Sequence, residues 1–117
     1  MKNNAILDKT MDFSIRIVNL YKYLKNQKKE TVMSKQLLRS GTSIRANVRE
    51  AHNGQSDKDF LAKIYIAYKE TSETEYWLTL LHKTDFLTEK QAKDIINDCE
   101  EIGKILTTII KTMKKKI

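Results

Sequence analysis

The sequence has no proline and only three glycines in 117 residues. Because these two residue types interrupt helices most strongly, the composition permits long uninterrupted helices. The single cysteine, Cys99, cannot form a disulfide within the chain, which favours a reducing compartment and predicts a cytoplasmic protein. No apolar run approaches the roughly 18 residues that a membrane-spanning helix needs, so we expect no membrane partner.

Patterns typical of catalysis and metal binding are also missing. His52 and His82 lie in no H-E-x-x-H or Glu-x-x-His motif, and with Cys99 they make no convincing zinc site. Cys99 falls within an apolar stripe, where a buried packing role is favoured over a nucleophile. A carboxylate cluster at 70–75 is interpreted as ion-paired with basic side chains rather than as an acid–base site. We therefore expect no enzyme, no cofactor and no metal.

Apolar residues recur at intervals of three and four residues in four segments. They predict helices at about 5–26, 32–52, 56–84 and 88–115. Ser56 suits a helix N-cap, and Thr88 with Gln91 has the spacing of a capping box. We expect the small residues at 40–43 to stay within a continuous helix and to permit close packing. Since the connections are short, the predicted fold is all-α: an antiparallel up-down-up-down four-helix bundle in a single domain, 1–117.

Charge is distributed unevenly along the chain, whose net charge is +7. Residues 1–49 hold 11 Lys/Arg and 3 Asp/Glu, a net +8, whereas residues 50–101 hold 6 and 12, a net −6. Residues 102–117 hold 5 basic and no acidic residues, a net +5. This pattern indicates internal ion pairing, a surface that binds polyanions, or both.

A basic face is predicted on the second helix, opposite its core face. Lysines near the end of the first helix (22, 25, 28 and 29) and in the C-terminal tail add to this charge. The candidate nucleic-acid-binding residues are Lys35, Arg39, Arg45, Arg49, Lys111, Lys114, Lys115 and Lys116. Such a surface can bind the phosphate backbone of a nucleic acid without sequence specificity. Alternatively, it is a solvated face that only maintains solubility, since that face would have the same composition.

The third helix carries more apolar surface than one core needs. Tyr65, Tyr68 and Trp77 lie beside its apolar stripe and are candidates for an oligomer interface. Alternatively, these aromatic side chains border the core with their polar ends in water.

Two segments, 34–51 (SKQLLRSGTSIRANVREA) and 67–78 (AYKETSETEYWL), resemble the signatures of a bacterial family. The family consists of four-helix-bundle proteins encoded in intervening sequences of large-subunit ribosomal RNA genes. It is similar to the accessory variability proteins of diversity-generating retroelements. The resemblance implies a homopentameric barrel and, for the retroelement relatives, a basic surface that binds nucleic acid and a reverse transcriptase.

The positions that match these signatures suggest an interhelical polar and packing network rather than a catalytic set. They are Arg39, Ser43, Ile44, Asn47 and Glu50 on the second helix, and Glu70, Glu73, Thr74 and Trp77 on the third. Arg45 and Arg49 stand where the family has small residues, which puts a tightly packed contact on that face in doubt.

Together these features predict a non-enzymatic homo-oligomer associated with RNA or DNA. The alternative is an assembly scaffold whose basic face binds an acidic protein partner, such as a polymerase or a ribosomal component.

Overall fold

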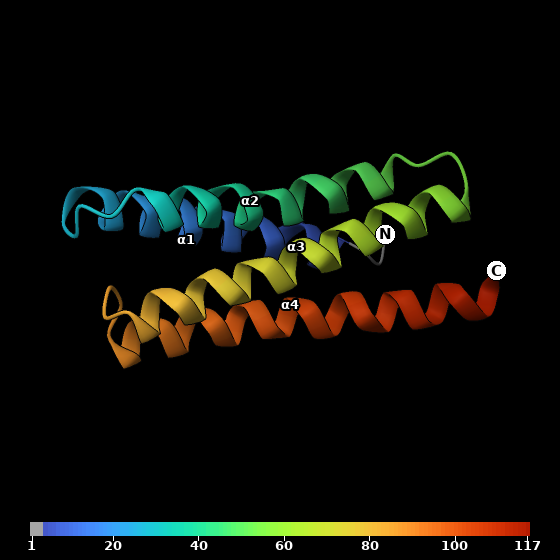
Figure 1. Cartoon of the computed structure of the whole chain (residues 1–117). Coiled ribbons are helices and arrows are strands. Elements are labelled where there is room, and N and C mark those ends of the chain that lie inside the picture. The colour runs from blue at the N-terminus through green and yellow to red at the C-terminus, as the bar shows by residue number, and fades with distance from the viewer. Residues whose placement is uncertain (1–3) are drawn as a thin grey trace.

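The computed structural model describes residues 4–117, which form a bundle about 46 × 21 × 20 Å in extent (Figure 1). Its four helices are α1 (Asn4–Asn26), α2 (Val32–His52), α3 (Asp57–Lys83) and α4 (Glu89–Lys116). The predicted boundaries lie within one residue of these. Successive helices run antiparallel, so the prediction of an all-α up-down-up-down bundle is confirmed. No helix of the described chain is both long and apolar enough to cross a membrane.

The core is formed by one apolar stripe from each helix. Ile17, Ile44, Leu78 and Leu106 are completely buried and come from α1, α2, α3 and α4 respectively. Each such side chain contributes roughly 1.5–3 kcal/mol through removal of its apolar surface from water. The bundle therefore holds together mainly through the repeating apolar positions read from the sequence.

Helix α2 continues through its run of small polar residues. Thr42 and Ser43 donate their hydroxyls to the carbonyls of Leu38 and Arg39, at 2.7 Å each, so these groups stay within the helix. Gly41 faces α1, where an added Cβ would lie 2.8 Å from Cγ2 of Ile17. The prediction of a continuous helix is confirmed, and Gly41 is the residue that allows α1 and α2 to approach closely.

Two helices begin at the caps that the sequence predicts. The Ser56 hydroxyl accepts the Asp59 backbone N–H at 3.1 Å at the start of α3. At the start of α4, Thr88 Oγ1 accepts the Gln91 N–H at 3.2 Å, and Gln91 Oε1 accepts the Thr88 N–H at 2.9 Å. This reciprocal pair confirms the capping box.

Helix α2 begins differently. Thr31, at the N-cap position, makes no side-chain hydrogen bond. Instead the buried carboxylate of Glu30 accepts the backbone N–H groups of Val32, Met33 and Ser34 at 3.1, 2.9 and 2.8 Å. Glu30 lies in the connection between α1 and α2, and in the structure its side chain caps α2.

Helices α1 and α4 pack less extensively than any sequential pair in the bundle. Ion pairs join the two helices: Lys9 Nζ lies 2.7 Å from Glu101 Oε1, and Arg16 bridges Asp94 at 3.0 Å and Asp98. We call this contact the α1–α4 seam. Because exposed ion pairs stabilise proteins little, this seam is the weakest of the four contacts between helices.

Candidate nucleic-acid interface

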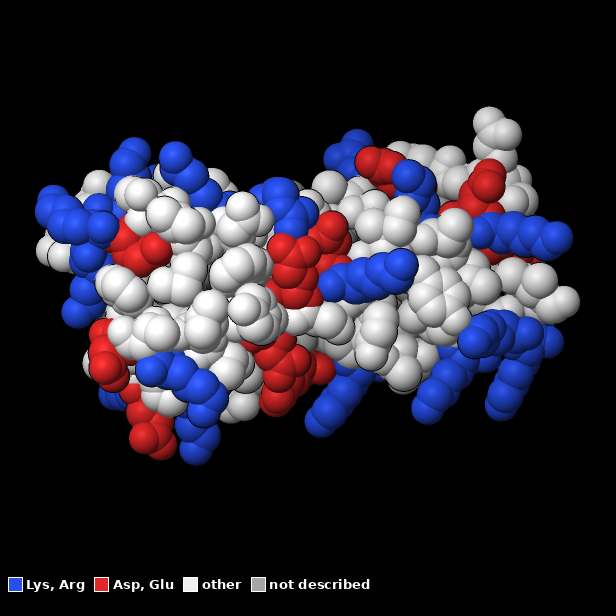
Figure 2. Space-filling model, viewed as in Figure 1, with Lys and Arg blue, Asp and Glu red and all other residues white. Residues whose placement is uncertain are grey.

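Charge is ordered along the long axis of the bundle. Figure 2 shows Lys and Arg gathered toward both ends of the bundle, a cluster of Asp and Glu in the middle, and further acidic side chains at each end. The first basic end lies around the α1–α2 connection and comprises Lys22, Lys25, Lys28, Lys29 and Lys35. The second basic end lies where α2 and α4 finish and α3 starts, and comprises Arg49, Lys58, Lys111, Lys114, Lys115 and Lys116. Folding thus brings together basic residues that lie far apart in the sequence, such as Arg49 and Lys114.

The structure divides the basic face predicted on α2. Lys35 and Arg49 are exposed, and within residues 4–117 neither forms an ion pair. They stand 14 residues apart, or about 21 Å along the helix, and so belong to opposite basic ends. Arg39 and Arg45 lie between them but have internal partners. These two residues therefore present less free charge on the predicted basic face than Lys35 and Arg49 do.

Arg39 belongs to a polar cluster between α2 and α3. Its guanidinium lies 3.3 Å from Glu70 Oε1 and also contacts Glu73, which accepts the Trp77 indole N–H at 3.1 Å. The hydrogen bonds from Arg39 and Trp77 lower the pKa of Glu73, and the bond to Glu73 raises the pKa of Arg39. Two carboxylates thus balance the Arg39 charge, which leaves little of it for a phosphate.

Arg45 is half-buried and turns toward α1. Its Nε donates to the carbonyl of Leu7 at 3.2 Å. A small residue at this position could not make that hydrogen bond, which links α1 to α2. Arg45 is therefore a structural residue in this chain.

The tail residues remain on the surface. Lys114 Nζ lies 5.7 Å from the centre of the Tyr65 ring, and its contact with the Tyr65 side chain raises its pKa. Lys116 Nζ is 3.7 Å from Asp57 Oδ2. Lys111 and Lys115 are exposed and form no ion pair within the described chain. All four lysines are therefore exposed near the C-terminal end of α4, and Lys116 is ion-paired.

The predicted interhelical network is only partly interhelical. Thr74 donates to Ser40 Oγ at 2.9 Å across α2 and α3, and Glu50 pairs with Lys63 at 2.8 Å. Ser43, in contrast, donates to the backbone of its own helix, as does Asn47, whose Nδ2 lies 2.9 Å from the Ser43 carbonyl. The prediction that Ser43 and Asn47 link two helices is wrong, because each reaches the carbonyl four residues earlier.

The three aromatic residues predicted at an oligomer interface differ in exposure. Tyr65 and Trp77 are half-buried, and Tyr68 is 39% exposed. The sequence interpretation missed Tyr76, which is 56% exposed and stacks edge-on against Trp77 with ring centroids 4.9 Å apart. An exposed tyrosine beside a tryptophan is a stronger interface signal than either half-buried residue.

Cys99 is completely buried, and its thiol donates to the Thr71 carbonyl at 3.4 Å. Burial, together with the nearby carboxylates Glu75 and Glu100, raises the pKa of the Cys99 thiol to about 12. Reactivity requires the thiolate, which is scarce at such a pKa. Cys99 therefore has the character of a packing residue.

We expect Cys99 to react with a disulfide reagent at pH 8 at least about a hundredfold more slowly in the folded protein than in urea, because both burial and the raised pKa act against it. The release of the coloured thiolate from Ellman's reagent measures both rates. Rapid reaction of the folded protein would contradict the buried position.

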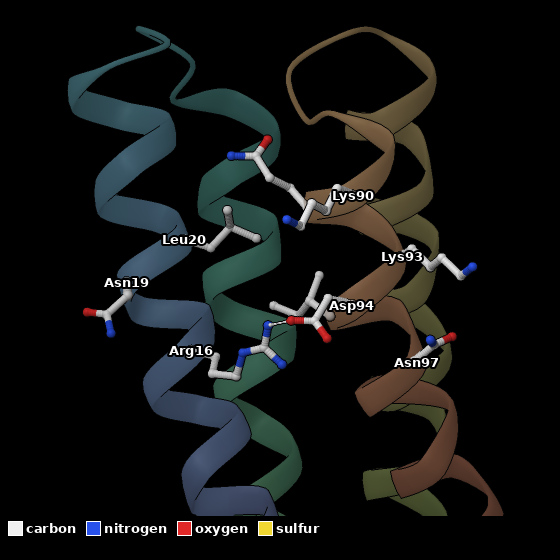
Figure 3. A pocket seen from close by; sticks show the side chains of 9 residues that line it. Arg16, Asn19, Leu20, Lys90, Lys93, Asp94 and Asn97 are labelled. Atoms are coloured by element: carbon white, nitrogen blue, oxygen red, sulfur yellow. Dashed lines mark hydrogen bonds and ion pairs between the residues drawn. The ribbon is translucent and has the colours of Figure 1, made fainter.

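A groove of about 850 Å³ opens along the α1–α4 seam (Figure 3). Arg16 reaches across it to Asp94, while Asn19 points away on the α1 side and Asn97 on the α4 side. Leu20 and Ile95 also line the groove. Among residues 4–117, no three His, Cys, Asp or Glu side chains gather in a way that could hold a metal ion. The arrangement offers binding surface and charge but no nucleophile paired with a base.

Comparison with known proteins agrees with the fold. The family described as 23S rRNA-intervening sequence protein matches residues 2–108. A 1.70 Å crystal structure from Bacteroides thetaiotaomicron VPI-5482, of a protein of unknown function from the S23 ribosomal protein family, is 58% identical in sequence. The match covers 95% of this chain and 99% of that one, with a TM-score of 0.93. No curated protein matches the chain.

Proposed function

The chain belongs to the 23S rRNA-intervening sequence protein family, and on that premise we propose that it is a non-enzymatic homo-oligomer that binds the phosphate backbone of RNA or DNA. The observation that supports this proposal is the gathering of Lys and Arg toward the two ends of the bundle. The subunit count that fits the family resemblance is five. The single free cysteine fits a cytoplasmic location.

The position of the charges favours contact at the ends of the bundle. A phosphate backbone lying along the middle would meet Arg39 together with Glu70 and Glu73, a group that carries no net positive charge. At the ends, lysines without internal partners can displace the counterions that surround a nucleic acid. Bundles standing side by side in an oligomer would align their ends and multiply these contacts.

We expect replacement of Arg49, Lys111, Lys114 and Lys115 by alanine to weaken binding to structured RNA or duplex DNA at least about tenfold near 0.1 M salt, because these side chains release counterions on binding. The slope of log affinity against log salt should become shallower by about 0.7–0.9 for each phosphate that the variant no longer neutralises. A salt titration of binding to labelled nucleic acid measures both.

Lys63→Ala and Arg39→Ala are matched controls, since both side chains are ion-paired to carboxylates on a neighbouring helix. They should leave the salt slope nearly unchanged. Equal affinity of the four-residue variant and the natural protein would overturn the assignment of this end. Absence of binding at low salt would reject the nucleic-acid function and leave an acidic protein, such as a polymerase or ribosomal component, as the partner of the basic ends.

A further inference from the structure

A pocket of about 360 Å³ opens at the second basic end, beside the turn that joins α2 to α3. Its walls come from the end of α2, the turn itself, the start of α3 and the end of α4. We call it the α2–α3 pocket, and its lining includes His52, Gln55, Asp57, Phe60, Met113 and Lys116. The volume lies within the range of pockets that bind small organic groups.

Two aromatic rings lie in the wall of the α2–α3 pocket. The ring centroids of His52 and Phe60 are 6.2 Å apart and their planes are inclined by 65°, an edge-on contact. Both side chains are half-buried, so part of each remains accessible. Met113 adds a flexible apolar side chain from α4. Such a wall suits a flat ring whose faces are apolar.

The pocket also contains a polar atom without a hydrogen-bond partner. His52 Nδ1 lies 3.0 Å from the Val48 carbonyl, which can only accept, so Nδ1 carries the proton and Nε2 of the neutral ring is an acceptor. Among residues 4–117, this Nε2 is the only buried side-chain nitrogen or oxygen that lacks a partner. A buried acceptor without a donor costs free energy, and a bound molecule with an N–H group would recover that cost.

Positive charge surrounds the α2–α3 pocket. Lys116 lies in its wall, 3.7 Å from Asp57. Arg49, Lys58 and Lys115 belong to the same end of the bundle, are exposed, and form no ion pair within the described chain. A ligand that matches these features is flat, donates an N–H at its edge and is attached to anionic groups. A nucleobase with its flanking phosphates has all three properties.

We propose that the α2–α3 pocket holds one unpaired base of a single-stranded nucleic acid. The base packs on Phe60 and Met113, and a small rotation of the His52 ring lets Nε2 accept an N–H from the pairing edge of the base. The flanking phosphates lie against the free cations of the second basic end. In a duplex the pairing edge is already occupied and the base is stacked, so a duplex cannot enter. This inference rests on the phosphate binding in the proposed function and adds a preference for single strands.

The first test compares a short single-stranded oligonucleotide with an abasic strand that carries the same phosphates. The intact strand should bind at least about fivefold more tightly, because stacking of a base on an aromatic side chain adds to the phosphate contacts. Equal affinity for the two strands would overturn the base site and leave backbone binding in place. Failure of both strands to bind at low salt would overturn the proposed function itself.

Variants of the two rings locate the base. Phe60→Leu removes an aromatic face, and His52→Phe keeps a ring but removes the acceptor nitrogen. Each should lower affinity for the intact strand toward that of the abasic strand, whose own binding should not change. Phe86→Leu is the matched control, since Phe86 is also half-buried but lies at the opposite end of the bundle, and it should keep the preference. Retention of the preference by either pocket variant would overturn this pocket as the base site.

Two measurements on the natural protein stay informative if a pocket variant unfolds. Irradiation with a single strand that contains thiouridine should crosslink the base to the segment 52–60 or to Met113, as identified by mass spectrometry. The nitrogen resonance of His52 Nε2 should shift when the intact strand is added, but not when the abasic strand is added. Crosslinks confined to residues outside the pocket, or an unchanged Nε2 resonance, would overturn the proposal.

Discussion

Replacing Gly41 with leucine is expected to lower the free energy of unfolding by at least about 3 kcal/mol, at the upper end of the range for overpacked cores. The first added atom would already lie 2.8 Å from Cγ2 and 2.9 Å from Cγ1 of Ile17. Ile17 is completely buried, so it has no empty space into which to turn. Urea unfolding followed by far-ultraviolet circular dichroism, at fixed protein concentration, measures the loss.

Gly103 supplies a matched control for this prediction. It also lies within a helix, but an added Cβ would be 3.8 Å from Thr71 Cγ2, an ordinary contact. Gly103→Ala should therefore stabilise the protein by up to about 1 kcal/mol through helix propensity alone. Gly41→Ala gains the same propensity but must displace Ile17, so we expect it to destabilise. Equal stabilisation by both alanine variants would show that α1 and α2 are not closely packed at Gly41.

Replacing Glu30 with alanine is expected to lower the free energy of unfolding by about 2–3 kcal/mol, more than the loss of an ordinary helix cap. The change removes the acceptor of three backbone N–H groups at the start of α2. Ser34 is completely buried, so water cannot replace the lost bond to its N–H. Thermal and urea unfolding of the variant measure the effect.

Thr31→Ala separates this role from ordinary capping. Thr31 occupies the N-cap position and has a residue type that favours it, yet its side chain makes no capping hydrogen bond. Its replacement should change stability by less than about 0.5 kcal/mol, as for most surface sites. Glu30→Gln keeps one acceptor oxygen and should fall between the two. A Thr31→Ala loss as large as that of Glu30→Ala would contradict the assigned cap.

Local patterns in the sequence were enough to predict the helices and two of their caps. Ser56 and the Thr88–Gln91 pair bond within three residues of themselves, and apolar spacing depends only on the turn of the helix. Glu30 was missed because its role depends on the chain turning at Lys29, where φ is 57°. The sequence contains no separate signal for that turn.

The candidate site was less predictable because side-chain partners lie far apart in the sequence. Arg45 bonds a carbonyl 38 residues away, which a helical wheel of α2 alone cannot reveal. Ser43 and Asn47 have the residue types of a network but sit where their own helix offers the nearer acceptor. The division of charge into two basic ends likewise arises only when antiparallel helices bring Arg49 and Lys114 to the same end.

The limited packing at the α1–α4 seam also affects the order in which the helices come together during folding. Nearly all other packing joins helices that follow one another, separated by connections of only a few residues. Closing such short loops costs little chain entropy, so consecutive hairpins can form early and the topology favours rapid folding. The seam joins the first helix to the last and requires closure of the longest loop. We therefore expect its ion pairs to form late in folding.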